Sequence, residues 1–284
     1  MEADSPASRT AYGAARHRAV HQVVEDGRIF RDPLAVPLLG ESPEDLRERG
    51  RAQASDRPMR WFVCARARYA DVVLDAAAAA GLDQLVVLGA GLDTFAYRNP
   101  YPGLRVVELD HPATQDWKLG RLRSAGIAVP ESVTHAPVDF ERDDLREVLR
   151  AHLDTGRPVL FWWLGVTPYL TVEAVSQTLG ILGALPHAAV VLDHASPPAA
   201  HESPERRAWL EARRQRVAEL GEPWVSEFEP DQLRGLLMDR GFDDVHLEDA
   251  AATIRRLLGL PPSPDPPRTR LALGARGWPV PAGG

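Results

Sequence analysis

The sequence has very little cysteine and no long apolar run. Cys64 is the single cysteine among 284 residues. It excludes a disulfide framework and a cysteine-based zinc site, and it is typical of a reducing compartment. Without an apolar run of about 18 residues, no membrane-spanning helix is expected. The first ten residues, MEADSPASRT, have no basic segment followed by an apolar stretch, so we expect no secretory signal. These features predict a soluble, cytoplasmic protein.

Positive charge is also in deficit. Lysine and arginine number 33 against 40 aspartates and glutamates, which gives a formal net charge of −7. An acidic chain is poorly suited to a nucleic-acid backbone, so we expect a small-molecule partner rather than nucleic acid or a membrane. No unit repeats at a fixed period, which excludes solenoids and propellers. The length suits one large α/β domain, alone or carrying a lid.

Short apolar segments alternate with helical segments from residue 83 onward. QLVVLGAG, LRVVELD, HAPVDF, PVLFWWLGV and AAVVLDHA are typical of buried strands, and helices are expected at 114–124, 143–153 and 172–185 between them. A further helix at 230–241, a strand near 245–247 and a final strand at 268–275 follow. Strands alternating with helices predict a mostly parallel sheet.

Two stretches do not follow this alternation. Residues 1–80 contain no recognisable strand and predict a helical N-terminal cap, with helices over 10–30 and 61–82 and a polar surface loop at 41–58. Residues 81–284 then form the sheet domain. Within it, a loop and a strongly charged helix at about 196–229 predict an inserted helical lid over the ligand edge of the sheet.

A glycine-rich turn follows the first predicted strand. Gly89 and Gly91 in LGAGLDT permit a sharp turn and a close approach of ligand to backbone. The second strand ends in Glu108-Leu109-Asp110, and a carboxylate at the end of that strand is placed to accept hydrogen bonds from ribose hydroxyls. A plain tight turn is the alternative for the glycines alone. Together with the acid, they favour an adenosine-containing ligand.

The residues after the turn distinguish between adenosine ligands. A dinucleotide site requires a third glycine where Thr94 stands, and Asp93 would repel a pyrophosphate. S-Adenosyl-L-methionine has no phosphate and carries a sulfonium and an ammonium, so it fits better. A nicotinamide-dependent oxidoreductase remains the alternative enzyme.

Several motifs resemble one known family. LGAGLDTFAYR, VVELDHPATQDWK, VDFERDDL and LGVTPYLT, in this order, resemble the leucine carboxyl methyltransferase family over about residues 10 to 245. The resemblance implies a Rossmann-like class I methyltransferase sheet whose last strand is antiparallel and inserted beside its neighbour. It also implies an S-adenosyl-L-methionine-dependent O-methyltransferase of small molecules, with a role in secondary metabolism.

The resemblance assigns a set of cofactor-binding residues: Arg18, Arg66, Gly89, Gly91, Glu108, Asp110, Asp139 and Phe140. In this assignment Arg66 pairs with the methionyl carboxylate, and Arg18 or its neighbour Arg16 adds a second positive charge. Asp110, or less suitably Glu108, holds the ribose. Asp139 accepts from the adenine amino group, with Phe140 against the ring, although Asp139 could instead cap a helix.

The methyl acceptor is expected beside Tyr169 and His194, the candidate catalytic residues. A carboxylate acceptor needs no general base, whereas a hydroxyl would benefit from His194 as base, with Tyr169 orienting it. Packing or capping is the alternative role for both side chains. Leu164 stands where the family usually has glutamate, which keeps a non-catalytic binding protein open as an alternative.

No metal is expected. His17 and His21 have the i,i+4 spacing of helical metal ligands, but no HExxH motif accompanies them, and flanking arginines would repel a cation.

Overall fold

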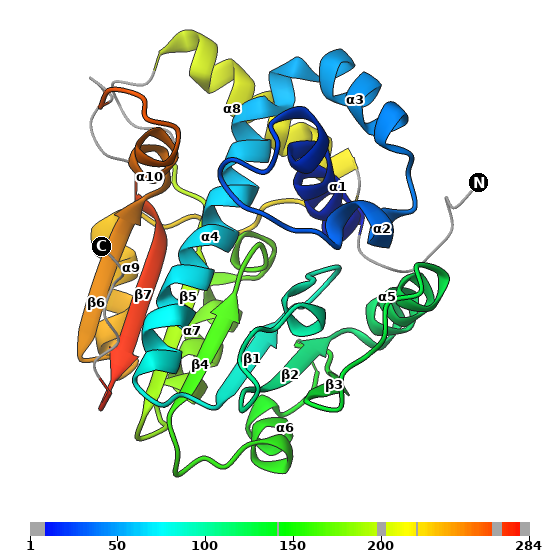
Figure 1. Ribbon diagram of the computed structural model, residues 1–284. Coiled ribbons are helices and arrows are strands. Elements are labelled where there is room, and N and C mark those ends of the chain that lie inside the picture. The colour runs from blue at the N-terminus through cyan, green and yellow to red at the C-terminus, as the bar shows by residue number, and fades with distance from the viewer. Residues whose placement is uncertain (1–8, 141, 198–202, 220, 263–268, 279–284) are drawn as a thin grey trace.

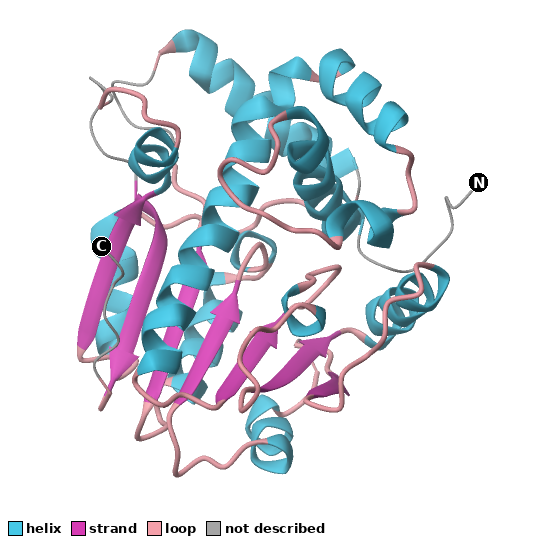
Figure 2. Ribbon diagram, viewed as in Figure 1, coloured by secondary structure: helices cyan, strands magenta, loops and turns pink. Residues whose placement is uncertain are grey.

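The central feature of the computed structural model is a seven-stranded sheet (Figures 1 and 2). The structure describes residues 9–140, 142–197, 203–219, 221–262 and 269–278. In order across the sheet, the strands are β3 (Val133–Pro137), β2 (Arg105–Asp110), β1 (Gln84–Leu88), β4 (Val159–Trp163), β5 (Ala188–Asp193), β7 (Thr269–Arg276) and β6 (Asp244–Asp249).

Strands β1 to β5 pair in parallel, and β7 is antiparallel to both β5 and β6. The expected mostly parallel sheet with an inserted, antiparallel last strand is therefore confirmed.

Helices cover both faces of the sheet because its central strands are apolar on both sides. Val86 of β1 belongs to a buried cluster with Val175 and Leu233, whereas the adjacent Leu85 clusters with Val73. Successive side chains of a strand point to opposite faces, so a continuous apolar run needs cover on both. The covering helices are α4 (Arg57–Ala79) and α10 (Ala250–Leu257) on one face, and α6 (Leu145–His152), α7 (Val172–Leu182) and α9 (Pro230–Asp239) on the other. Helix α5 (Pro112–Ser124) lies beside β3.

The N-terminal helices gather above the carboxyl ends of the parallel strands (Figure 1). They are α1 (Arg9–Val24), α2 (Ala35–Leu39), α3 (Pro43–Ala52) and the first half of α4. Helix α8 (Pro204–Glu219), the centre of the predicted insertion, lies on the same side of the sheet. Residues 198–202 and 220 of that insertion lie outside the described residues. The division at residue 80 stays a prediction, since α4 belongs to the cap and also packs on the sheet.

Two expectations for the cap were wrong. Residues 41–58 are not a loop but contain α3, whose first turn is capped by Ser42, the acceptor for the N–H of Asp45 at 3.1 Å. The first helix ends at Val24 rather than near residue 30, because Asp26 (φ 51°) and Gly27 (φ 62°) adopt left-handed backbone conformations. Helix α10 was not anticipated.

A buried ion pair joins α4 to the chain just after α1. The Glu25 carboxylate accepts from Arg60 at 2.6 Å and contacts Nδ1 of His21 at 2.8 Å. Burial opposes ionisation of Glu25, but these two partners outweigh it and lower its pKa to about 2. The ionised acid therefore helps to hold the cap together.

No helix in the described part of the chain is long and apolar enough to cross a membrane.

Candidate active site

A cavity of about 740 Å³ opens between the carboxyl edge of the sheet and the helices above it. This volume lies in the range of about 300–1,000 Å³ that is usual for small-molecule sites. The turn after β1, the end of β2 and the loops after β3 and β4 form its floor, and α1, α3, α4 and α8 form the other walls. The cap and the predicted lid thus face the sheet across one space.

The glycine turn lies in the cavity wall. Gly89 (φ 67°) and Gly91 (φ 47°) both have left-handed conformations, which favour glycine. A side chain at Gly89 would also collide, because its Cβ would lie 2.4 Å from Cγ2 of Val166. A Cβ at Gly91 would lie 3.1 Å from that of Ala11 in α1. The turn needs glycine both for its shape and for its close contacts.

Asp110 lines the cavity directly beside this turn. Its Oδ2 accepts the N–H of Gly91 at 2.5 Å, and its Oδ1 accepts the N–H of His111 at 2.7 Å. Burial raises the pKa of Asp110, and the two backbone hydrogen bonds offset this only in part. The carboxylate is fixed in orientation, with one further acceptor position on each oxygen.

Glu108, the weaker ribose candidate, is not among the residues that line the cavity. Its side chain is only 1% exposed, and it pairs with Nζ of Lys118 at 2.7 Å and the hydroxyl of Tyr97 at 2.9 Å. Glu108 is thus held in an internal ion pair, and of the two acids of β2 it is Asp110 that lines the cavity.

Asp139 and Phe140 lie in the cavity wall after β3. Asp139 is not the cap of the next helix, because α6 begins at Leu145 and Asp144 accepts the N–H of Arg146 at 2.9 Å. The capping alternative is therefore wrong. The structure brings Asp139 and Phe140 to the same cavity as Asp110.

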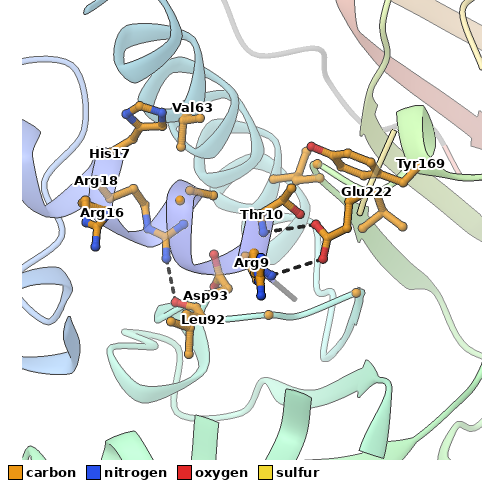
Figure 3. A pocket seen from close by; sticks show the side chains of 18 of the residues that line it. Arg9, Thr10, Arg16, His17, Arg18, Val63, Leu92, Asp93, Tyr169 and Glu222 are labelled. Carbon is orange, nitrogen blue, oxygen red and sulfur yellow. Dashed lines mark hydrogen bonds between the residues drawn. The ribbon is translucent and has the colours of Figure 1, made fainter. Parts of the chain in front are cut away.

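Arg66 and Arg18 reach the cavity from α4 and α1, and both are buried. Arg66 donates from Nη1 to Asp193, at the end of β5, at 2.9 Å. Arg18 pairs with Asp32 at 3.2 Å and donates to the carbonyl of Leu92, after the glycine turn, at 2.6 Å (Figure 3). Arg18 thereby ties α1 to the turn, while Arg66 has donors beyond the one used by Asp193.

The two candidate catalytic residues lie in different surroundings. Tyr169, on a short 3₁₀ turn at Thr167–Tyr169, points into the cavity (Figure 3). His194 is 2% exposed, is not a lining residue, and contacts the carbonyl of Ala195 through Nδ1 at 3.1 Å. Burial lowers the pKa of His194 and favours a neutral ring. The structure therefore brings Tyr169, and not His194, to the space where an acceptor would lie.

Sequence reasoning missed Glu222, which lies in the segment GEPW at residues 221–224. Its Oε1 and Oε2 accept the backbone N–H groups of Arg9 and Thr10, each at 3.1 Å (Figure 3). An acid at a helix N-terminus is favoured by the unpaired N–H groups and by the helix dipole. Glu222, which also lines the cavity, thus joins the chain after α8 to the start of α1.

Comparison with known proteins agrees with this geometry. The family model described as leucine carboxyl methyltransferase matches residues 11–182. The chain belongs to the leucine carboxyl methyltransferase family.

Curated relatives in this family come from several bacteria. YktD of Bacillus subtilis is 31% identical over 177 residues, which cover 61% of this chain and 57% of YktD. A protein of Mycolicibacterium paratuberculosis is 30% identical over 227 residues, which cover 76% of this chain and 70% of the relative. Both are named for S-adenosyl-L-methionine-dependent methyl transfer. The match spans 57% to 64% of the length of the first four relatives.

Solved structures share the fold. A methyltransferase structure from Thermobifida fusca superposes with a TM-score of 0.56 at 18% identity, covering 92% of this chain and 94% of the other. An O-methyltransferase family protein from Burkholderia thailandensis gives a TM-score of 0.51 at 14% identity, covering 94% of this chain and 72% of the other. The fold is therefore the Rossmann-like class I methyltransferase fold.

Proposed function

We propose that this chain is an S-adenosyl-L-methionine-dependent O-methyltransferase that acts on a small molecule of secondary metabolism. The observation that carries the proposal is the Asp110 carboxylate, which two backbone N–H groups orient beside the Gly89–Gly91 turn at the cavity floor. A nucleoside ribose offers two adjacent hydroxyl donors that match the two oxygens. Membership of the leucine carboxyl methyltransferase family and the names of its relatives support the same activity.

Other cavity residues complete a site for the methyl donor. Asp139 accepts from the adenine amino group and Phe140 contacts the ring, since both lie in the wall after β3. Arg66 holds the methionyl carboxylate with the donors that Asp193 leaves free. Leu164, in the place of the family glutamate, also lines the cavity and supplies no charge, so Asp93 faces the ammonium group instead.

When bound, the methyl donor would supply an electrophilic methyl group on its sulfonium. In an in-line displacement the acceptor oxygen would form the new bond to this carbon while the carbon–sulfur bond breaks and S-adenosyl-L-homocysteine leaves as the thioether. The chain contributes alignment and the exclusion of water, which are effective for this reaction class. Tyr169 donates a hydrogen bond that orients the acceptor. A carboxylate acceptor is ionised near neutral pH and needs no base. This suits a cavity from which His194 is excluded.

The nicotinamide alternative is less well supported. Asp93 lies in the cavity wall, where a pyrophosphate would meet its carboxylate. Thr94, in the place of the third glycine of a dinucleotide site, is buried and donates to Asp32 at 2.8 Å. A side chain therefore occupies the position at which that fingerprint needs a glycine.

Titration calorimetry with S-adenosyl-L-homocysteine and, separately, with NADH tests the cofactor. We expect saturable binding of the first and none of the second. Turnover is then measured with methyl-labelled S-adenosyl-L-methionine over a panel of carboxylic acids and phenols. Products that are cleaved by mild alkali are esters, and stable products are ethers. Binding without turnover over the whole panel would support the non-catalytic alternative, and absence of binding would refute the proposal.

A further inference from the structure

Many guanidinium groups line the cavity. Most of them have a carboxylate partner at close range: Arg16–Glu41 at 3.0 Å, Arg18–Asp32 at 3.2 Å, Arg60–Glu25 at 2.6 Å, Arg66–Asp193 at 2.9 Å and Arg216–Asp56 at 3.0 Å. These arginines are neutralised within the protein, so their presence alone does not indicate a charged ligand.

Arg213 of α8 differs from this group. It lines the cavity, yet among the described residues its side chain makes no ion pair or hydrogen bond, and its Nε is buried without a partner. Asp56 is the carboxylate that acts on the pKa of Arg213, and it is already bonded to Arg216 at 3.0 Å. Burial lowers the pKa of Arg213, which means that its cationic form is held at a cost.

The neighbours of Arg213 leave its charge uncompensated. His17 also lines the cavity, and burial together with Arg213, Arg60 and Arg66 lowers its pKa to about 3. Its ring is therefore neutral at physiological pH. Val63 and Val217 add apolar surface to the cavity wall. Among the described residues, Arg213 thus presents an unpaired guanidinium group to a cavity whose wall also has apolar surface.

We propose that Arg213 selects the methyl acceptor by pairing with a carboxylate on an otherwise apolar molecule. A carboxylate matches the planar guanidinium group in charge and geometry, and the pair gains strength where water is excluded. Tyr169, which lies close enough to Arg213 to act on its pKa, lines the same cavity and hydrogen-bonds the same ligand. The inference rests on the proposed function, because it takes the remaining space beyond the methyl donor as the acceptor site.

Matched acid and amide probes test this pairing in the presence of saturating S-adenosyl-L-homocysteine. The probes are 4-phenylbutyrate with 4-phenylbutyramide, and octanoate with octanamide. Because hydrogen bonds to charged groups contribute about 1.5–3 kcal/mol, we expect each acid to bind at least about tenfold more tightly than its amide. Arg213→Met removes this preference and Arg213→Lys keeps part of it.

The control is Arg214→Met on the same helix. Arg214 pairs with Glu227 and is not a lining residue, so this variant keeps the full preference. Affinity for S-adenosyl-L-homocysteine stays within about twofold in all variants. Equal binding of acid and amide by the wild type, failure of the acids to bind, or a preference that survives in Arg213→Met would overturn the inference.

Two results separate this inference from the proposed function. If Arg213→Met weakens S-adenosyl-L-homocysteine as much as the acids, Arg213 serves the methyl donor and the acceptor assignment is wrong. If the wild type binds no S-adenosyl-L-homocysteine, the proposed function itself fails, whatever the acids do.

Discussion

Replacing Asp110 with asparagine removes the feature on which the ribose assignment depends. In the wild type each carboxylate oxygen accepts one backbone N–H, at 2.5 and 2.7 Å, and keeps a second acceptor position for a ribose hydroxyl. The asparagine side chain has one oxygen and one amino group. In either orientation the amino group faces a backbone N–H donor and cannot accept from a ribose hydroxyl. One of the two ribose hydrogen bonds is therefore lost, and the other is made to a neutral oxygen instead of a charged one.

The expected loss is about 2–3 kcal/mol, or about 30- to 150-fold in the Kd for S-adenosyl-L-homocysteine. Titration calorimetry measures it, and thermal melting checks that the variant is folded. Asp244→Asn, at an exposed acid of β6 that does not line the cavity, is the matched control and leaves the Kd unchanged. A folded Asp110→Asn protein that binds within about threefold of the wild type would refute the ribose assignment.

The same variant has a pH signature. Burial raises the pKa of Asp110, so the ionised form is present above that raised value and is lost as the pH falls through it. Wild-type affinity for S-adenosyl-L-homocysteine therefore declines on acidification at a higher pH than an ordinary aspartate would give. The Asp110→Asn protein lacks this decline, which calorimetry from pH 7.5 downward would detect. An identical pH profile in the two proteins would show that the ribose is held elsewhere.

Three other changes have defined outcomes. Gly89→Ala places a methyl group in a left-handed, crowded position and lowers the free energy of unfolding in urea by about 1–3 kcal/mol, whereas no loss would mean that the turn relaxes freely. Glu25→Gln leaves Arg60 buried without its anion and costs about 3 kcal/mol at pH 7. His21 and Arg60 lower the pKa of Glu25 to about 2, so the stability that ionised Glu25 contributes is present above pH 4.5 and is lost as the pH falls from 4.5 toward 2. The free energy of unfolding of Glu25→Gln therefore depends less on pH over that interval than that of the wild type. Parallel curves of unfolding free energy against pH for the two proteins would contradict this. Glu222→Gln weakens the hydrogen bonds that join the chain after α8 to the N-terminus of α1 and speeds dissociation of S-adenosyl-L-homocysteine by about tenfold in stopped-flow measurements. An unchanged dissociation rate would assign Glu222 to stability alone.

Local pattern was sufficient for the sheet and insufficient for parts of the cap. The short continuous apolar run QLVVL is buried on both faces as β1, and its composition and length are typical of such a strand. Helix α3 has few apolar residues, so apolar periodicity does not predict it, even though Ser42 followed by Pro43 is a usable helix-start signal. Its burial comes from contact with α1, which is not encoded near it in the chain.

The residues of the candidate site also differ in how far local sequence predicts their place. Gly89 and Gly91 come just after β1 and Asp110 is the last residue of β2, so the ends of these strands fix where the three residues lie. Glu108 and His194 also occupy strand ends or nearby positions, but distant residues decide their surroundings. Lys118 on α5 neutralises Glu108.

The sequence by itself determined the mostly parallel sheet, the glycine turn, the acid beside it and the family, because each is set by short motifs along the chain. Only the tertiary structure decided which of the two acids of β2 faces the cavity, which helix end Glu222 caps, and that Arg213 faces the cavity without a partner among the described residues. Those facts depend on contacts between segments up to 213 residues apart, and charge pairing across such distances has no local pattern in the chain.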